Sequence, residues 1–230
     1  MSAALGVLML ETRFPRPLGD IGHPGTFRFA VRYRTVRGAT PERVVLGEDA
    51  TLLQPFVAAA RALASEGVAA LTTSCGFLVR FQAELAAAVT VPVWTSSLLL
   101  VAELDAGWSD GRRAGVVTVD AGSLTAAHLS AAGARADTPV EGLAVDSRFR
   151  ATLLHDRAEL DADEAERTTV AAAERLLARH PEVAAIVLEC TNMPPYADAV
   201  RAATGRPVHD ITTLVRDRFA RLDAASRSAA

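Results

Sequence analysis

The chain has 230 residues, half of them hydrophobic, and a formal net charge of −3. This is the composition of a globular protein with room for one large domain or two lobes, and it excludes an extended basic surface for nucleic acid or an anionic membrane. All 24 basic residues are arginine, so there is no lysine for a pyridoxal-phosphate Schiff base or a Walker-type phosphate loop.

The apolar runs of the chain are short. None reaches the roughly 18 residues that a membrane-spanning helix requires, and residues 1–14 lack the basic segment of a signal peptide. We therefore expect a cytoplasmic protein with no membrane partner. Two cysteines are too few for a disulfide framework.

Aliphatic runs alternate with alanine-rich segments of helical periodicity, which is the pattern of an α/β protein with parallel strands. In chain order, strands are predicted at 5–10, 68–74, 91–94, 114–120, 183–189 and 206–210. Helices are predicted at 49–67, 77–89, 95–107, 123–133, 161–180, 194–205 and 212–222, with an uncertain turn or short segment at 40–48.

The two halves of the chain align at a constant spacing of 115 residues. Cys75 then matches Cys190, and Pro92 matches Pro207. This repeat predicts an internal duplication that gives two similar Rossmann-like lobes with parallel sheets and an active site in the cleft between them. We expect residues 1–96 with 211–230 to form the first lobe and residues 97–210 the second.

Residues 11–40 break this symmetry. The segment holds three prolines before a partly alternating stretch, TFRFAVRYRTV, that predicts a β-hairpin arm or an edge strand. Its role remains open: it is either a cover over the site, or a surface excursion or dimer contact.

Each cysteine follows an apolar strand and precedes a helix, where the helix dipole is expected to lower the thiol pKa toward neutrality. Backbone N–H groups of residues 76, 77, 191 and 192 would be available to a substrate anion. Two thiols on opposite faces of a carbon acid can remove and return a proton, which inverts a stereocentre. The alternatives are two inert buried cysteines or a zinc site completed by scattered histidines such as His209.

Residues 72–78 read TTSCGFL and residues 188–196 read LECTNMPPY. With the repeat around them, these stretches resemble the aspartate/glutamate racemase superfamily, which includes hydantoin racemases, arylmalonate decarboxylases and maleate isomerases. The resemblance implies cofactor-independent chemistry with Cys75 and Cys190 as the acid/base pair. It also implies a substrate-binding role for Thr191 and an assisting acid at the position of Glu11. Because members of this family are often dimers, this chain is expected to be capable of forming a homodimer.

The first cysteine motif departs from the family. Gly76 and Phe77 follow Cys75, where amino-acid racemases of the family usually have Asn and Thr, so a less polar substrate than free glutamate is expected. The leading prediction is a racemase or epimerase for an amino-acid derivative, a hydantoin or a related carboxylate. A decarboxylase, a cis–trans isomerase and a non-catalytic binding protein for a small acid are the alternatives. The residues expected to contact the substrate, without a metal, are Glu11, Ser74, Gly76, Phe77, Ser96, Thr191 and Asn192.

Overall fold

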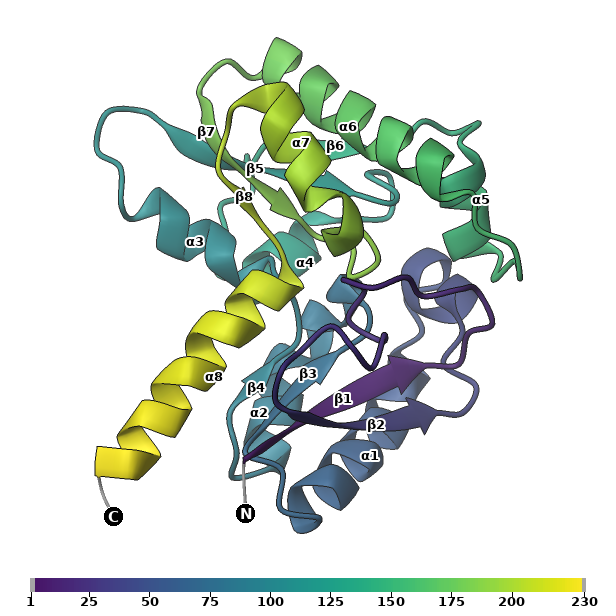
Figure 1. Ribbon diagram of the computed structural model, residues 1–230, viewed down its shortest axis with the longest axis vertical. Coiled ribbons are helices and arrows are strands. Elements are labelled where there is room, and N and C mark those ends of the chain that lie inside the picture. Colours follow the sequence, from purple (N-terminus) through teal and green to yellow (C-terminus); the bar gives the residue numbers. More distant parts are fainter. Residues whose placement is uncertain (1–2, 229–230) are drawn as a thin grey trace.

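The computed structural model describes residues 3–228 and contains two parallel four-stranded sheets (Figure 1). The first has the strand order β2-β1-β3-β4 and the second β6-β5-β7-β8. The strands are β1 (Ala4–Leu10), β2 (Ala30–Val36), β3 (Ala70–Thr73), β4 (Val93–Trp94), β5 (Arg113–Thr118), β6 (Val140–Gly142), β7 (Val183–Leu188) and β8 (Val208–His209). The predicted fold class of two similar α/β lobes is confirmed.

The helices cover both faces of these sheets. They are α1 (Leu53–Ser65), α2 (Gln82–Ala88), α3 (Leu99–Asp105), α4 (Ala126–Ala131), α5 (Arg148–Leu154), α6 (Ala162–Arg179), α7 (Ala197–Thr204) and α8 (Ile211–Ser228). Two elements were not predicted: β6, which is only three residues long, and α5. The segment after Cys75 begins as a 3-10 helix (Gly76–Phe81) before α2, and α7 likewise follows a 3-10 helix (Pro194–Tyr196).

The duplication is visible in the pairing of the strands. Leu71 of β3 pairs with Val93 of β4, and Ile186 of β7 pairs with Val208 of β8. Each residue of the second pair lies 115 positions after its counterpart in the first, which is the spacing that relates the two cysteines. The cysteines therefore follow equivalent strands of equivalent sheets.

Strand β1 is buried along its whole length because helices cover both of its faces. Leu5, Val7 and Met9 pack on the side of α8, whereas Leu8 and Leu10 belong to the cluster that contains α1. The division of the chain into lobes 1–96 with 211–230 and 97–210 stays a prediction.

Residues 11–29 form the crossover that returns the chain from the end of β1 to the start of β2, and this loop lies along the junction between the two sheets (Figure 1). Strand β2 pairs in parallel with β1 at the edge of the sheet, so the edge-strand alternative is correct and the hairpin alternative is wrong. Phe27 and Phe29 stack in series with Phe219 of α8, with ring centroids 4.9 and 4.3 Å apart.

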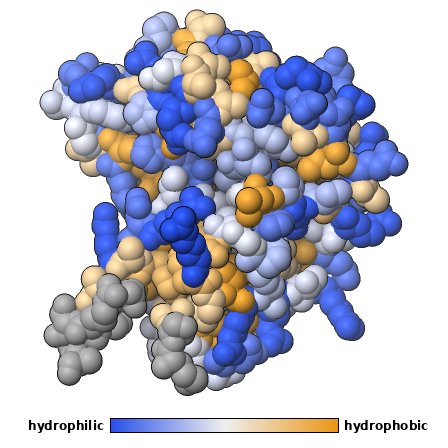
Figure 2. All heavy atoms as spheres, in the orientation of Figure 1, coloured by the Kyte–Doolittle hydropathy of each residue, from blue (hydrophilic) through white to orange (hydrophobic). Residues whose placement is uncertain are grey.

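The face of the molecule seen in Figure 2 is covered mainly by polar and charged side chains, with apolar side chains gathered beside α8 and the first sheet. Within residues 3–228, no helix combines the length and apolar character that crossing a bilayer requires.

Candidate active site

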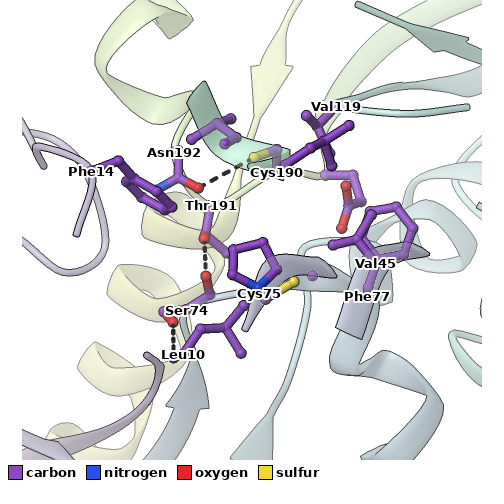
Figure 3. A pocket seen from close by; sticks show the side chains of 15 residues that line it. Leu10, Phe14, Val45, Ser74, Cys75, Phe77, Val119, Cys190, Thr191 and Asn192 are labelled. Atoms are coloured by element: carbon purple, nitrogen blue, oxygen red, sulfur yellow. Dashed lines mark hydrogen bonds between the residues drawn. The ribbon is translucent and has the colours of Figure 1, made fainter. Parts of the chain in front are cut away.

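The two lobes enclose one pocket that contains both cysteines (Figure 3). Its cavity volume is about 30 Å³, well below the roughly 300–1,000 Å³ typical of small-molecule sites. The lining residues are Leu10, Phe14, Pro41, Val45, Ser74, Cys75, Gly76, Phe77, Val119, Leu153, Leu154, Glu189, Cys190, Thr191 and Asn192. The pocket is therefore compact and mostly apolar.

The thiols of Cys75 and Cys190 enter the pocket from the two lobes and lie on opposite sides of it in Figure 3. Both are free and buried, each with 8% of its surface exposed. The crossover supplies Phe14 to the wall, and the residues before α1 supply Pro41 and Val45. Part of the segment 11–40, at Phe14, therefore covers the pocket, which is one of the roles left open for that segment, and Pro41 and Val45 just after it extend the cover.

One hydrogen bond joins the two cysteine loops, and two more anchor the ends of the strands that precede them. The Thr191 hydroxyl donates to the backbone carbonyl of Ser74 (2.7 Å), and the Ser97 hydroxyl donates to the carbonyl of Leu188 (2.7 Å). The backbone N–H of Leu10 donates to the Ser74 hydroxyl (2.8 Å). The side-chain hydroxyls of Ser74 and Thr191 thus hold the frame of the pocket that they line.

A buried polar chain leads from the crossover to Cys190. Arg16 forms an ion pair with Asp20 (2.9 Å), and the other carboxylate oxygen of Asp20 accepts a hydrogen bond from Asn192 Nδ2 (2.6 Å). This orients the Asn192 amide so that its Oδ1 faces Cys190, which donates from Sγ at 3.5 Å. Because an amide oxygen accepts but cannot donate, this contact favours the protonated thiol of Cys190.

Replacing Asp20 by asparagine is expected to lower the free energy of unfolding by about 3–5 kcal/mol, because Arg16 would keep a buried, uncompensated charge. The side chains of Arg16 and Asp20 are only 11% and 1% exposed. Urea denaturation measures the loss. The matched control is Asp110→Asn, which removes an exposed partner of Arg112 and is expected to cost less than about 1 kcal/mol. Equal losses in the two variants would contradict a structural role for the buried pair.

The prediction that the helix dipole lowers the thiol pKa values is wrong for this pocket. Burial raises the pKa of Cys75 to about 12, with a further rise from the negative charge of Glu189. The same two causes, in the same order, raise the pKa of Cys190 well above its ordinary value. The helix after Cys75 is a short 3-10 segment, so its N–H groups offset only part of the cost of burial.

The two thiols differ in what offsets that cost. Backbone N–H groups of Phe77 and Leu78 and the positive charge of Arg16 all lower the pKa of Cys75. For Cys190 the main such contribution is the backbone N–H of Asn192. The surroundings therefore stabilise the thiolate of Cys75 more than the thiolate of Cys190.

Glu189, directly before Cys190, is a site residue that the sequence reading missed. It has no exposed surface, its Oε2 accepts a hydrogen bond from the Thr118 hydroxyl (2.7 Å), and its Oε1 is buried without a partner. Burial raises the pKa of Glu189 to about 7, and the Thr118 hydrogen bond lowers it by less. The available signal was an acid at the end of an apolar strand, at the position that Ser74 occupies in the other repeat.

This shift predicts a stability that depends on pH. The folded state holds the Glu189 proton more tightly than the unfolded chain, so the stabilisation is complete below the ordinary pKa of 4.5 and disappears as the pH rises to about 7. Over this window the unfolding free energy of the wild type should fall by roughly 3 kcal/mol relative to Glu189→Gln, at about 1.4 kcal/mol per pH unit. Urea denaturation of both proteins across the window measures the difference, and parallel curves would contradict the assignment.

Two residues expected at the site lie outside the pocket. The Glu11 side chain is exposed and accepts a hydrogen bond from the backbone N–H of Gly38 (2.8 Å). Ser96 is buried, and its hydroxyl accepts from the N–H of Leu98 (3.1 Å). Among residues 3–228, no group of three or more His, Cys, Asp or Glu side chains is arranged to hold a metal ion.

Known proteins resemble this chain over most of its length. Dimethylsulfoniopropionate lyase 3 of Emiliania huxleyi (strain CCMP1516) is 34% identical over 230 aligned residues, which cover 95% of this chain and 60% of that protein. A dimethylsulfoniopropionate lyase of Durusdinium sp. clade D is 33% identical, with 90% of this chain and 71% of that protein covered. The chain thus spans about three fifths of the Emiliania relative.

Solved structures share the fold at lower identity. Arylmalonate decarboxylase superposes with a TM-score of 0.64 at 18% identity, covering 95% of this chain and 92% of that one. A glutamate racemase isoform of Bacillus anthracis gives a TM-score of 0.54 at 16% identity, covering 94% and 82%. The family model described as Asp/Glu/Hydantoin racemase matches residues 39–216, a range that contains both cysteine loops. The chain therefore belongs to the Asp/Glu/hydantoin racemase family.

Proposed function

We propose that the chain is a cofactor-independent lyase that eliminates dimethyl sulfide from dimethylsulfoniopropionate or a close analogue. One observation carries the proposal: both cysteines of the repeat line one compact, mostly apolar pocket. The names and identities of the lyases that cover at least 90% of this chain support this choice of substrate.

The reaction is a β-elimination. A thiolate removes a proton from the carbon next to the carboxylate, the electron pair of that C–H bond forms the carbon–carbon double bond, and the C–S bond breaks with its electrons left on sulfur. Acrylate and neutral dimethyl sulfide are the products, and the proton stays on the cysteine until solvent takes it. The enzyme then needs one base positioned against an activated carbon acid.

Cys75 is the base in this proposal, since its anion receives the N–H groups of Phe77 and Leu78 and the field of Arg16. Cys190, whose proton faces Asn192 Oδ1, stays a thiol on the other side of the substrate. The apolar walls exclude water from the reacting carbon, which strengthens the electrostatic interactions inside the pocket.

The direct test supplies dimethylsulfoniopropionate to the purified protein and measures dimethyl sulfide in the headspace together with acrylate in solution. Equal amounts of the two products are expected. The absence of both, in a protein that unfolds cooperatively, would remove the lyase proposal.

Racemisation is the second candidate, favoured by the presence of a thiol from each lobe in the same pocket. It shares the first step with the elimination but needs the second thiol to return a proton to the opposite face. In deuterated buffer, a racemase exchanges the α-proton of a chiral hydantoin or amino-acid derivative and releases the opposite enantiomer without cleaving the molecule. Exchange and inversion at equal rates, without dimethyl sulfide release, would favour this candidate over the lyase.

A further inference from the structure

The pocket contains one acidic side chain and no basic side chain to balance it. Glu189 is the acid, and none of the other lining residues is Asp, Glu, Arg, Lys or His. Arg16, the cation that acts on Cys75, is already engaged: its guanidinium binds Asp20 and Thr12 and lies over the Phe14 ring, 4.7 Å from the centroid. An ionised Glu189 therefore has no counter-charge among the pocket walls.

Only one of the two carboxyl oxygens of Glu189 has a hydrogen-bond partner. Thr118 binds Oε2, while Oε1 is buried on the pocket wall without a hydrogen-bond partner. A buried carboxylate in apolar surroundings is costly unless a proton or a cation compensates it. A ligand that carries a positive charge would supply that compensation.

The walls indicate which kind of cation fits. Phe14, Val45 and Phe77 present rings and methyl groups, which suit the methyl groups of an onium ion and its diffuse charge. A primary ammonium would bring three N–H donors, and Glu189 has one free oxygen to accept them. A methylated sulfonium or ammonium needs no acceptor at all.

We infer that Glu189 is the specificity-determining residue that recognises the positive charge of the substrate, and that the pocket selects compact methylated onium carboxylates. The substrate class deepens the lyase proposal and rests on it. The inference also gives the thiols a route to ionisation. The negative charge of Glu189 raises the pKa of both cysteines, so a cation bound beside it removes that repulsion.

The inference is tested by comparing the binding of two molecules of the same shape, of which one carries a positive charge and the other does not. The probes are the trimethylammonium analogue of propanoate and the molecule in which a quaternary carbon replaces the nitrogen; neither contains a sulfonium leaving group. Isothermal titration calorimetry is expected to show that the wild type binds the cationic probe at least about tenfold more tightly. Glu189→Gln should bind the two probes within about twofold of each other. The control is Glu84→Gln, an exposed position with the same change of charge, and it should behave as the wild type.

The wild type alone provides a second measurement that does not depend on a variant folding. Because burial raises the pKa of Glu189 to about 7, the preference for the cationic probe should grow as the pH rises through neutrality. Equal affinities for the two probes, no binding of either, or a preference retained by Glu189→Gln would each overturn the inference. If the protein prefers the cationic probe but releases no dimethyl sulfide, the inference about Glu189 holds and the lyase proposal is refuted. If it releases dimethyl sulfide but shows no preference for the cationic probe, the lyase proposal holds and the inference is refuted.

Discussion

Replacing Cys75 by alanine is expected to slow dimethyl sulfide release by about a hundredfold to ten-thousandfold, the range that general-base catalysis contributes. Replacing Cys190 is expected to cost at most about tenfold, because the departing sulfide is neutral and needs no proton from an acid. The inequality follows from the surroundings of the two thiols: Cys75 receives two backbone N–H groups and the field of Arg16, and Cys190 donates to Asn192. Initial rates at saturating substrate measure both effects.

Serine variants at the same two positions are the matched controls. Serine keeps the shape of the side chain but ionises far less readily, so Cys75→Ser should be as inactive as Cys75→Ala while unfolding at a similar urea concentration. Equal large losses at both cysteines would point to the two-base chemistry of a racemase. A fully active Cys75→Ala would place the base elsewhere in the pocket.

Replacing Gly76 by alanine is expected to destabilise the fold by roughly 1–3 kcal/mol and to reduce activity by about a hundredfold, since a misplaced reacting group is that costly. A Cβ at this position would lie 2.1 Å from Glu189 Oε1 and 2.6 Å from the backbone carbonyl oxygen of the same residue. The carboxylate could swing away, but the backbone oxygen is on the residue that directly follows β7 and cannot. Urea denaturation and initial rates measure the two effects.

Gly122→Ala is the control for that experiment. Its Cβ would meet Asp120 Oδ1 at 3.7 Å, an ordinary contact, so stability should stay within about 0.5 kcal/mol of the wild type. If Gly76→Ala were as stable and active as Gly122→Ala, the close approach of the two cysteine loops would not be essential to the site.

The sequence was sufficient for the parts of the fold that repeat. Strands β3 and β7 are apolar runs that end at a cysteine, and the 115-residue spacing made them equivalent before their pairing was known. Strand β6 could not be predicted from the sequence because Val140–Gly142 is short and includes a charged residue, Glu141. The partners of Glu141 are Arg175 and Arg179, which lie on α6. No local pattern signals a strand that depends on so distant a contact.

Within the site, the sequence located the thiols but misjudged their surroundings. The dipole argument used the neighbouring chain, whereas the thiol pKa values depend first on burial and then on Glu189, which for Cys75 belongs to the other lobe. Alignment of the repeats placed Glu189 opposite Ser74 and Gly76 opposite Thr191. Those two mismatches compensate each other across the lobes, since the glycine leaves the space that the glutamate fills. The differences between the repeats therefore lie at the site too, although only the similarities were used to predict it.

The hydrogen bond from Thr191 to Ser74 also bears on how a substrate can enter. It is buried and joins the two predicted lobes next to the thiols, whereas Ser97 and Leu188 are bonded within the second lobe. A hinge opening of the lobes would break the Thr191–Ser74 bond, at about 1 kcal/mol or more. Moving Phe14 or Val45, which line the pocket, would leave it intact. The route to the cysteines that costs fewer hydrogen bonds between the lobes therefore passes Phe14 and Val45.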